Sequence, residues 1–344
     1  MKLFHASVEG AQHGAKGFDG FLKFASYAGA AGCQPSNFML EDGKGGFLPP
    51  AYIKRKFAER GLMFDGISAH CPFWVHTTAW TGSKTMKSFL PASLTAASVE
   101  KIEDWAKDYI FRLLDLCADL GVKVVPMFWG TAWGWEVATG YPWGFWKGPG
   151  YDLIAEGDDR FVNLTEVVRN RANSFGIVLA HEIHPGTGAM CASDFLHIVK
   201  ICDGDGCLGV NKDDSHCWEG ESWQTRFDLV ADRVYGCHMK NHYVRPGHPL
   251  RSMIPDWSSR PMQFTALDRG DIDLLRSTEQ LIRIGYSRRY CILTSAKTAP
   301  LVVEAEGAYE NLDAISARGI KWVRDNCCFN VAEGSFEDGM GADK

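Results

Sequence analysis

Three side chains that can bind a metal stand at the ends of three successive apolar segments. Glu182, Asp213 and His238 each close a short apolar run, and about one strand and one helix separate each from the next. Carboxylate oxygens and imidazole nitrogens are ligands of Mn²⁺, Mg²⁺ and Co²⁺. Such a cation can polarise a carbonyl group and stabilise the charge that forms when a neighbouring C–H loses its proton. One histidine at a strand end is more often a hydrogen-bonded core residue, but three groups at successive strand ends predict one bound divalent cation.

Two candidate proton-transfer groups lie two residues beyond predicted ligands. His184 follows Glu182, and Lys240 follows His238. Side chains two residues apart on a strand face the same side, so we expect both beside the metal, with His184 as the base and Lys240 as the cationic acid. The alternatives are structural, since His184 could support the loop through Pro185 and Lys240 could be paired with an acid.

Other side chains at strand ends or in the following loops are weaker candidates for contact with a substrate. Their claim rests on position, and for the histidines and the arginine also on hydrogen-bonding capacity. The candidates are His216, Arg245, Trp129, His70 and His5.

Strands that alternate with helices must position these groups. Hydrophobic periodicity predicts strands at residues 2–7, 34–38, 62–70, 122–128, 179–185, 208–216, 233–242 and 289–295. Helices are expected at residues 18–30, 51–60, 98–120, 159–173, 193–201, 222–231, 274–285 and 304–318. Eight such units predict an α/β fold, a (β/α)8 TIM barrel, whose site lies at the carboxyl ends of the strands. We expect one barrel domain at residues 1–320 and a C-terminal extension at residues 321–344.

A long aromatic loop is expected after the fourth strand, at residues 129–158. It holds five tryptophans among glycines and prolines: Trp129, Trp133, Trp135, Trp143 and Trp146. Aromatic side chains over a polar pocket stack on sugar rings or exclude water, so the loop is interpreted as a lid. The alternative is a packed loop without substrate contact.

Composition limits the partners of the 344-residue chain. The net charge of −6 is spread along the chain without a basic block, which argues against nucleic acid as a partner. No apolar run has the length of a membrane span, and no signal segment opens the chain. Eleven cysteines, an odd count that includes several in apolar strands, favour the reducing cytoplasm. A homo-oligomer or a small partner subunit is possible.

At the predicted ligands the chain resembles the sugar phosphate isomerase/epimerase superfamily, the xylose-isomerase-like TIM barrels. His181-Glu182-Ile183-His184-Pro185 resembles that family's Glu-Ile-His-Pro strand. Asn211-Lys212-Asp213-Asp214-Ser215-His216 and His238-Met239-Lys240-Asn241 resemble its next two strand ends. Arg269-Gly270-Asp271-Ile272-Asp273 and Ile284-Gly285-Tyr286 match segments before its last strand. The resemblance implies that Glu182, Asp213 and His238 are ligands and that His184, His216, Lys240 and Arg245 face the substrate.

The chain departs from that pattern at the predicted eighth strand. The family ends this strand with a glutamate that serves as a fourth ligand and moves protons in the epimerases, whereas residues 292–297 read Ile-Leu-Thr-Ser-Ala-Lys. Glu304 and Glu306 come too late in the chain for this role unless the strand end is remodelled. A site without the second glutamate would depend on one dominant base, for which we expect His184.

The expected function is that of a divalent-metal-dependent sugar isomerase or epimerase that removes a proton next to a sugar carbonyl. The close alternative is a metal-dependent lyase that eliminates a β-substituent from a keto-sugar or keto-glycoside. A different class is a sugar-binding or scaffolding barrel with a degenerate site, although five matching site residues argue against that decay.

Overall fold

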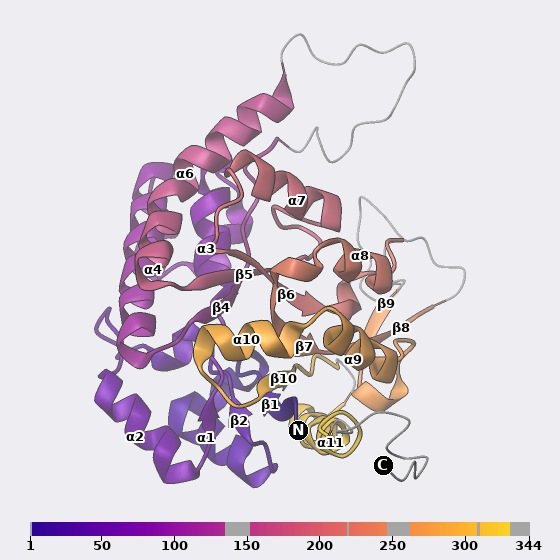
Figure 1. The fold of residues 1–344 in the computed structure, drawn as a ribbon. Helices are drawn as coiled ribbons and strands as arrows, with labels where there is room; N and C mark the ends of the chain where they lie inside the picture. The colour runs from indigo at the N-terminus through magenta and orange to yellow at the C-terminus, as the bar shows by residue number, and fades with distance from the viewer. Residues whose placement is uncertain (1, 135–151, 219, 246–261, 308–309, 331–344) are drawn as a thin grey trace, which may run out of the picture.

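The computed structural model describes residues 2–134, 152–218, 220–245, 262–307 and 310–330. Its centre is a six-stranded parallel sheet in the order β1-β10-β7-β6-β5-β4 (Figure 1). The strands of this sheet are β1 (Phe4–Val8), β4 (Val124–Met127), β5 (Val178–Glu182), β6 (Leu208–Asp213), β7 (Val234–Met239) and β10 (Ala299–Val303). Nearly every residue in them is buried, because helices cover the outside of the sheet and side chains fill the inside.

Two very short strands lie between the edges of this sheet. β2 (Gly32–Cys33) and β3 (Met63–Phe64) pair with each other in parallel. The amide of Gln34 donates to the Val8 carbonyl at the end of β1 (2.9 Å), and the amide of Ala69 donates to the Pro126 carbonyl in β4 (2.8 Å). The segments that follow β2 and β3 are therefore hydrogen-bonded to the two edge strands of the larger sheet.

The buried carboxylate of Glu9 links the carboxyl ends of β1, β2 and β3, where the main chain forms few hydrogen bonds between strands. Glu9, directly after β1, accepts hydrogen bonds from the hydroxyl groups of Ser36 (3.0 Å) and Ser68. These serines follow β2 and β3, and the main chain forms an isolated bridge between them. Glu9 therefore connects three strand ends that few backbone hydrogen bonds hold together.

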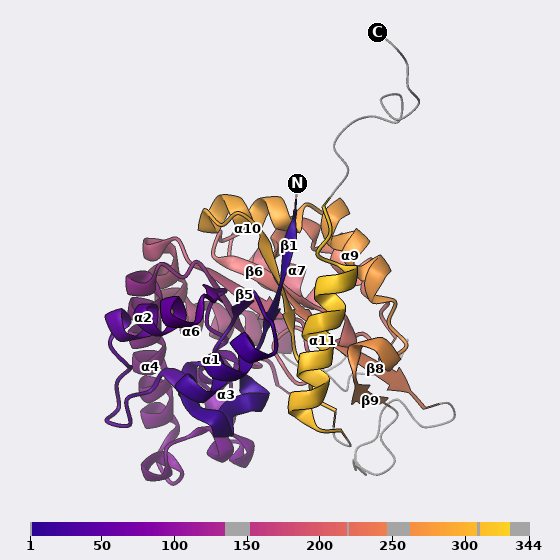
Figure 2. The same ribbon diagram turned by 90° about the horizontal axis from the view of Figure 1, so that it is seen from below.

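The helices cover the sheet and carry conventional end signals. In α4, Ser98 accepts a hydrogen bond from the amide of Lys101 at the start, and Gly121 adopts a φ of 80° at the end. In Figure 2, α11 runs alongside β1 and β10. The helices are α1 (Gly17–Tyr27), α2 (Pro50–Arg60), α3 (His70–Thr78), α4 (Val99–Leu120), α6 (Leu153–Phe175), α7 (Ala192–Ile201), α8 (Trp223–Leu229), α9 (Leu274–Arg283), α10 (Tyr286–Thr294) and α11 (Leu312–Asn326).

Several shorter elements surround the strand ends. An antiparallel hairpin of β8 (Asn241–Val244) and β9 (Met262–Thr265) follows β7. The 3₁₀ helices are η1 (Ala11–Lys16), η2 (Asn37–Leu40), η3 (Ala79–Thr81), η4 (Lys84–Phe89), η5 (Ala92–Leu94), η6 (Asp214–His216), η7 (Ala231–Arg233) and η9 (Leu267–Arg269).

The predicted eighth strand at residues 289–295 is wrong, because most of this segment belongs to helix α10. Tyr286 and Tyr290, one helical turn apart, are both buried, whereas Ile292 is 71% exposed. Such burial fits a helix on the outside of the sheet rather than a strand within it. The strand is β10, which pairs with β1 along its whole length. The helix expected from residue 304 begins only at Leu312.

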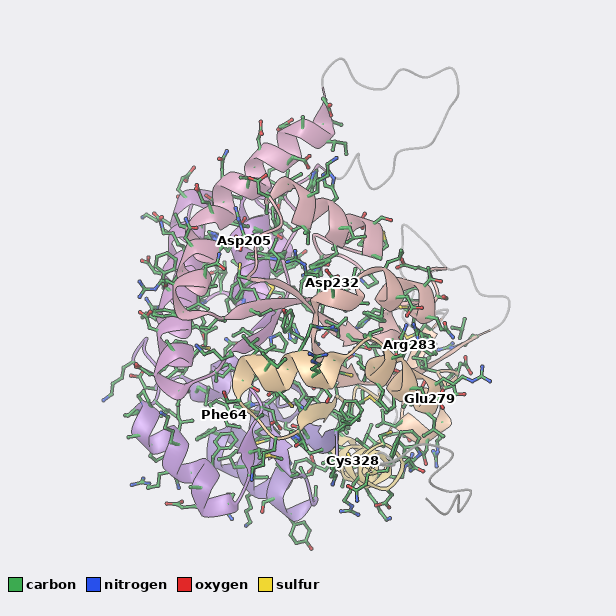
Figure 3. All side chains as sticks on the ribbon, in the orientation of Figure 1. Phe64, Asp205, Asp232, Glu279, Arg283 and Cys328 are labelled. Carbon is green, nitrogen blue, oxygen red and sulfur yellow. The ribbon has the colours of Figure 1, made fainter. Side chains whose placement is uncertain are left out.

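One ion pair connects helix α6 to the loop that precedes β6. Arg169 of α6 lies 2.7 Å from Asp205, which precedes β6 and is labelled in Figure 3. Both side chains are about nine-tenths buried. Asn173 and the amide of Cys207 also donate hydrogen bonds to Asp205, so protein donors contact both oxygens of its carboxylate.

Two expected segments fall largely outside the described residues. Residues 135–151 of the aromatic loop and residues 331–344 of the expected extension belong to the undescribed part of the chain. Residues 321–326 continue α11, so the expected domain boundary after residue 320 falls inside a helix. Among the described helices, none is both long enough and apolar enough to cross a membrane.

Candidate metal centre

Four ligand-type side chains meet at the carboxyl ends of the parallel strands. Glu182 is the last residue of β5, Asp213 is the last residue of β6, and His238 is the penultimate residue of β7. Glu304 directly follows β10. One potential ligand atom from each of these four buried residues lies within 4.8 Å of the others. The three ligands predicted from the sequence are therefore brought together, with a fourth carboxylate beside them.

Glu304 occupies the place where no carboxylate was expected. Its Oε2 lies 2.9 Å from Nδ1 of His238 and 3.2 Å from Nζ of Lys240. The expectation that the glutamate is missing was wrong because it relied on the misplaced strand. Once the strand is Ala299–Val303, Glu304 stands at the strand end like the other ligands.

The donor set fits a divalent cation. Within the described part of the chain, Asp213 Oδ2, His238 Nδ1 and Glu304 Oε2 are buried and make no hydrogen bond of acceptable geometry. Unsatisfied buried polar atoms are costly, and these three are held by ion-pair contacts of 2.9–3.2 Å with one another and with Lys240 rather than by well-formed hydrogen bonds. Three carboxylates and one imidazole supply the oxygen and nitrogen ligands of Mg²⁺, Mn²⁺ or Co²⁺.

Neighbouring donors and acceptors orient the ligands. Nε2 of His238 lies 2.9 Å from Oε1 of Gln34, which can only accept a hydrogen bond. Nε2 therefore carries a proton, and Nδ1 points toward the carboxylates. Asn211 donates to Oε2 of Glu182 at 2.8 Å, and Gln12 donates to Oε1 of Glu304 at 3.2 Å. These contacts hold the ring and both glutamates in place.

Charges inside the cluster shift its pKa values strongly. Burial alone would raise the pKa of Glu182, but the imidazoles of His216, His238 and His70, at 3.1, 3.0 and 3.5 Å from its carboxylate oxygens, hold it well below its usual value. Burial opposes ionisation of Glu304 too, yet Lys240 and His238 lower its pKa to about 2. All three carboxylates are therefore ionised at neutral pH, because the pKa of Asp213 is also lowered, burial being outweighed by Lys240 and His216.

The histidines and the lysine balance these charges. Burial would lower the pKa of His216, but Asp213 raises it to about 9. The pKa of Lys240 is raised well above its usual value because Asp213, Glu304 and Glu306 outweigh burial. Its Nζ lies 3.2 Å from Asp213 and 3.1 Å from Glu306. Lys240 therefore stands as a cation at the edge of the cluster.

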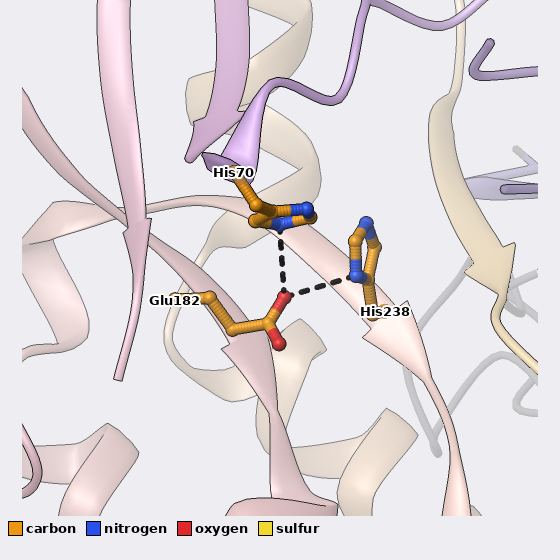
Figure 4. A group of neighbouring side chains, drawn as sticks. All are labelled: His70, Glu182 and His238. Atoms are coloured by element: carbon orange, nitrogen blue, oxygen red, sulfur yellow. Dashed lines mark ion pairs between the residues drawn. The ribbon is translucent and has the colours of Figure 1, made fainter. Parts of the chain in front are cut away.

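His70 approaches the centre from the start of α3. Its Nε2 lies 3.5 Å from Oε2 of Glu182, and His238 contacts the same oxygen at 3.0 Å (Figure 4). These three residues form a second group that could hold a metal ion. His70 is thus part of the centre, although only its position recommended it in the sequence.

His184 lies on the other flank, against His216. The two ring centroids are 4.0 Å apart, and Nδ1 of His184 lies 2.6 Å from the Pro185 carbonyl. Burial and the nearby His216 lower the pKa of His184 to about 3, so its ring is neutral at physiological pH. Nδ1 is engaged with the main chain, which leaves Nε2 for other contacts. Phe128, after β4, packs on both His184 (4.9 Å) and His70 (4.3 Å).

The structure places Trp129 and His5 outside the cluster. Trp129 is fully buried between Phe73 and Phe161, at centroid distances of 5.7 and 5.6 Å. His5 pairs with Asp65 (3.0 Å) at the opposite, amino-terminal side of the strands, where it is aligned with Pro300. Arg245 is half-buried directly after β8.

Sequence reasoning missed five residues of the centre and its surroundings. Glu304 and Asn211 had a usable signal, since Glu304 follows a buried-type run like the other candidate ligands and Asn211 lies two residues before Asp213 on the same strand. The others lie in segments that meet the site only through the fold. The five are Glu304, Gln34, Asn211, Gln12 and Phe128.

The comparisons with known proteins agree with this architecture. Residues 22–326 match the model of a family described as xylose isomerase-like TIM barrels. The chain belongs to this family. The resemblance drawn from its motifs is thereby confirmed. No curated protein matches the chain in sequence.

Several solved structures share the fold at low sequence identity. A xylose isomerase-like TIM barrel protein from Mycobacterium smegmatis in complex with magnesium is 15% identical, with a TM-score of 0.58 over 94% of this chain and 96% of that chain. A 3-keto-D-glucoside 4-epimerase from E. coli is 14% identical, with a TM-score of 0.59 over 94% of this chain and 99% of that chain. A probable 3-DHS dehydratase from Bacillus anthracis is 14% identical, with a TM-score of 0.57 over 93% of this chain and 98% of that chain. At these identities, the likeness concerns the fold.

Proposed function

We propose that the protein is a divalent-metal-dependent epimerase or isomerase of a keto-sugar, built on a complete (β/α)8 barrel that β2 and β3 close. The observation that carries the proposal is the pair of glutamates around one imidazole. Oε2 of Glu182 and Oε2 of Glu304 lie 3.0 and 2.9 Å from Nδ1 of His238. Their strands are separated by β6 and β7 in the sheet, so the two carboxylates reach the centre from different sides.

Two carboxylates on different sides provide an acid and a base for the two faces of one carbon. Bound at Glu182, Asp213, His238 and Glu304, a divalent cation would polarise the substrate carbonyl. One glutamate takes a proton from the carbon next to that carbonyl, and the other returns a proton to the opposite face. Inversion of that carbon is epimerisation, whereas return of the proton to the former carbonyl carbon is isomerisation. Because Glu304 is present, proton abstraction does not have to fall on His184 alone.

The cationic and neutral side chains at the rim have supporting roles in this proposal. Lys240 stabilises the negative charge that develops on the carbonyl oxygen. His184 has Nε2 available for a substrate hydroxyl, and His216 and His70 hold Glu182 from two sides at 3.1 and 3.5 Å. All eleven cysteines lie in the described ranges as free thiols, which supports a reducing cytoplasmic location.

A metal-dependent lyase is the second candidate, and Lys240 favours it. Its Nζ lies 3.2 Å from both Asp213 and Glu304, so a cationic acid stands where it can protonate a departing oxygen. The likeness to a 3-keto-D-glucoside 4-epimerase and to a probable dehydratase supports a substrate with a carbonyl next to the reacting C–H. The third possibility, a non-catalytic sugar-binding barrel, is a defined outcome of the test below.

The test measures proton exchange and products together. We expect the purified protein to hold one divalent cation per chain by elemental analysis. Incubated in D₂O with ketohexoses and 3-keto-glucosides, it should exchange one C–H next to the carbonyl and give an epimer or an isomer by NMR. Glu182→Gln and Glu304→Gln should each lose roughly 10²- to 10⁴-fold in exchange rate.

The control is Glu166→Gln, which removes an exposed carboxylate from the surface of α6 and should leave exchange unchanged. Release of an alcohol together with an unsaturated sugar would assign the lyase instead. A metal-loaded protein that binds these sugars without exchanging any proton would be a binding barrel. Full exchange in both glutamine variants would place the base elsewhere.

A further inference from the structure

A cavity of about 590 Å³ opens beside the metal centre. Its inner end is formed by Ser36, Ser68 and His70. The two serines donate to Glu9, and His70 lies 3.5 Å from Glu182, so this end adjoins the cluster. The ligands Glu182, Asp213, His238 and Glu304 do not line the cavity. It is a second compartment that reaches outward from the centre.

Aromatic side chains form the outer part of this cavity. Tyr109 is held in place by hydrogen bonds with Asn37 (2.8 Å) and Glu41 (2.7 Å). Trp105 and Phe47 pack against its ring at centroid distances of 5.6 and 5.3 Å. Leu90, Pro72 and Pro91 add further apolar surface. This part of the wall is thus rich in aromatic side chains that contacts within the protein hold in place, and it also includes the polar residues Asn37, Glu41, Ser88 and Arg112.

Two phenylalanines at this cavity are exposed in the ligand-free chain. Phe38 of η2 is 46% exposed and Phe89 of η4 is 44% exposed, and both line the cavity. They come from elements that are about fifty residues apart in sequence. Large apolar side chains gathered at one exposed cavity indicate a surface that a ligand covers.

We propose that this cavity binds an aryl group attached to the sugar, so that the substrate is an aryl keto-glycoside rather than a free monosaccharide. The inference rests on the proposed function, because it places the sugar itself at the metal centre. Cavities of roughly 300–1,000 Å³ accept drug-sized ligands, which are larger than one sugar ring. Aromatic rings pair favourably with other aromatic rings. Several polar side chains also line the cavity, but Asn37 and Glu41 are hydrogen-bonded to Tyr109, and Ser36 and Ser68 to Glu9. A second sugar ring would therefore find few free partners for its hydroxyl groups.

Binding of unoxidised glycosides tests the cavity independently of catalysis. Phenyl and methyl glucosides lack the ketone, so their affinity for the metal-loaded protein reports binding without turnover. In the anomeric series that binds, phenyl glucoside should bind at least about tenfold more tightly than methyl glucoside, by isothermal titration calorimetry. Phe38→Ser and Phe89→Ser should reduce this preference to less than about threefold.

Phe329→Ser is the matched control, since Phe329 is 49% exposed and does not line the cavity. It should keep the full preference. Equal affinity for phenyl and methyl glucosides, or a preference that survives in both cavity variants, would overturn the inference. Tighter binding of a methyl disaccharide than of phenyl glucoside would assign the cavity to a second sugar and overturn it too.

The experiments distinguish failure of the cavity inference from failure of the proposed function. If the phenyl preference depends on Phe38 and Phe89 but phenyl 3-keto-glucoside shows no proton exchange, the cavity inference stands and the proposed function fails. If exchange occurs equally well with phenyl and methyl 3-keto-glucosides and neither parent glycoside is preferred, the proposed function stands and the cavity inference fails.

Discussion

Replacing Gln34 by leucine should weaken metal binding without touching a ligand. Oε1 of Gln34 lies 2.9 Å from Nε2 of His238, and the amide nitrogen of Gln34 donates to the Asp65 carbonyl at 3.2 Å. The amide therefore presents its oxygen to the ring, and Nε2 carries a proton. Glu304 and Glu182 outweigh burial and raise the pKa of His238 well above its usual value, so Nδ1 also carries a proton that faces the carboxylates. A metal on Nδ1 would displace that second proton and leave the one on Nε2. Leucine has a similar volume but cannot accept the Nε2 proton.

The size of the loss in metal affinity depends on whether the missing hydrogen bond affects the metal-free or the metal-bound variant. Without metal, the ring of Gln34→Leu can lose the Nε2 proton and keep the one on Nδ1, which faces Glu182 and Glu304 at 3.0 and 2.9 Å. With metal on Nδ1, the proton must stay on Nε2, buried and without an acceptor. An unsatisfied buried donor costs about 1–3 kcal/mol. Since 1.4 kcal/mol is about a factor of ten, metal affinity should fall roughly 10- to 100-fold, the usual range for such supporting contacts.

The assay is a chelator-competition titration of Mn²⁺ with the wild-type protein and each variant. Gln280→Leu is the control, because Gln280 is also a buried glutamine with two hydrogen bonds, to Gln224 and Asp228, far from the cluster. Both variants should lose stability in urea with chelator present, but only Gln34→Leu should lose affinity. Unchanged affinity in Gln34→Leu, or equal losses in both variants, would refute the assignment of a proton to Nε2 of His238.

Three further changes test the packing, an ion pair and the rim of the centre. Trp129→Ala should lower the free energy of unfolding by about 3–5 kcal/mol in urea, because the indole is packed between Phe73 and Phe161; normal stability with impaired turnover would support the lid interpretation instead. Asp205→Asn should cost roughly 2–4 kcal/mol at pH 7. Hydrogen bonds that include the one from Arg169 outweigh burial and depress the pKa of Asp205 below 3.8, so its stabilising effect is complete above pH 3.8 and disappears as the pH falls through the folded value. A cost that stays constant from pH 7 to pH 3 would contradict this. His184→Gln should keep the metal and reduce proton exchange by about 10²-fold or more, and full exchange would remove His184 from the reaction.

Local sequence pattern was enough to predict the candidate ligands that lie at the end of a recognisable strand. Glu182, Asp213 and His238 each lie at or next to the end of a short buried run, so the strand and its terminal residue could be recognised together. Their mutual approach then followed from the geometry of parallel strands, which all end on one side. The same reasoning misplaced His5 and Trp129, because a position near a strand end does not say which end of the barrel or which face a side chain occupies.

The eighth strand shows where local pattern stopped being sufficient. Residues 289–295 carry the apolar Ile292-Leu293 pair, whereas β10 begins with Ala299-Pro300, and proline is unfavourable inside a sheet. Tertiary contacts decided otherwise: Tyr286 and Tyr290 anchor one segment as a helix, and pairing with β1 makes the other a strand.

The sequence by itself determined the family and placed candidate metal ligands at the ends of β5, β6 and β7, because these depend on residues only a few positions apart. The tertiary structure alone decided that Glu304 joins the candidate ligands, that His70 reaches Glu182, and that Gln34 contacts Nε2 of His238. Gln34 and His238 are 204 residues apart. No local periodicity encodes such a contact, since it exists only once β1 and β10 lie side by side and bring the segment after β2 close to β7.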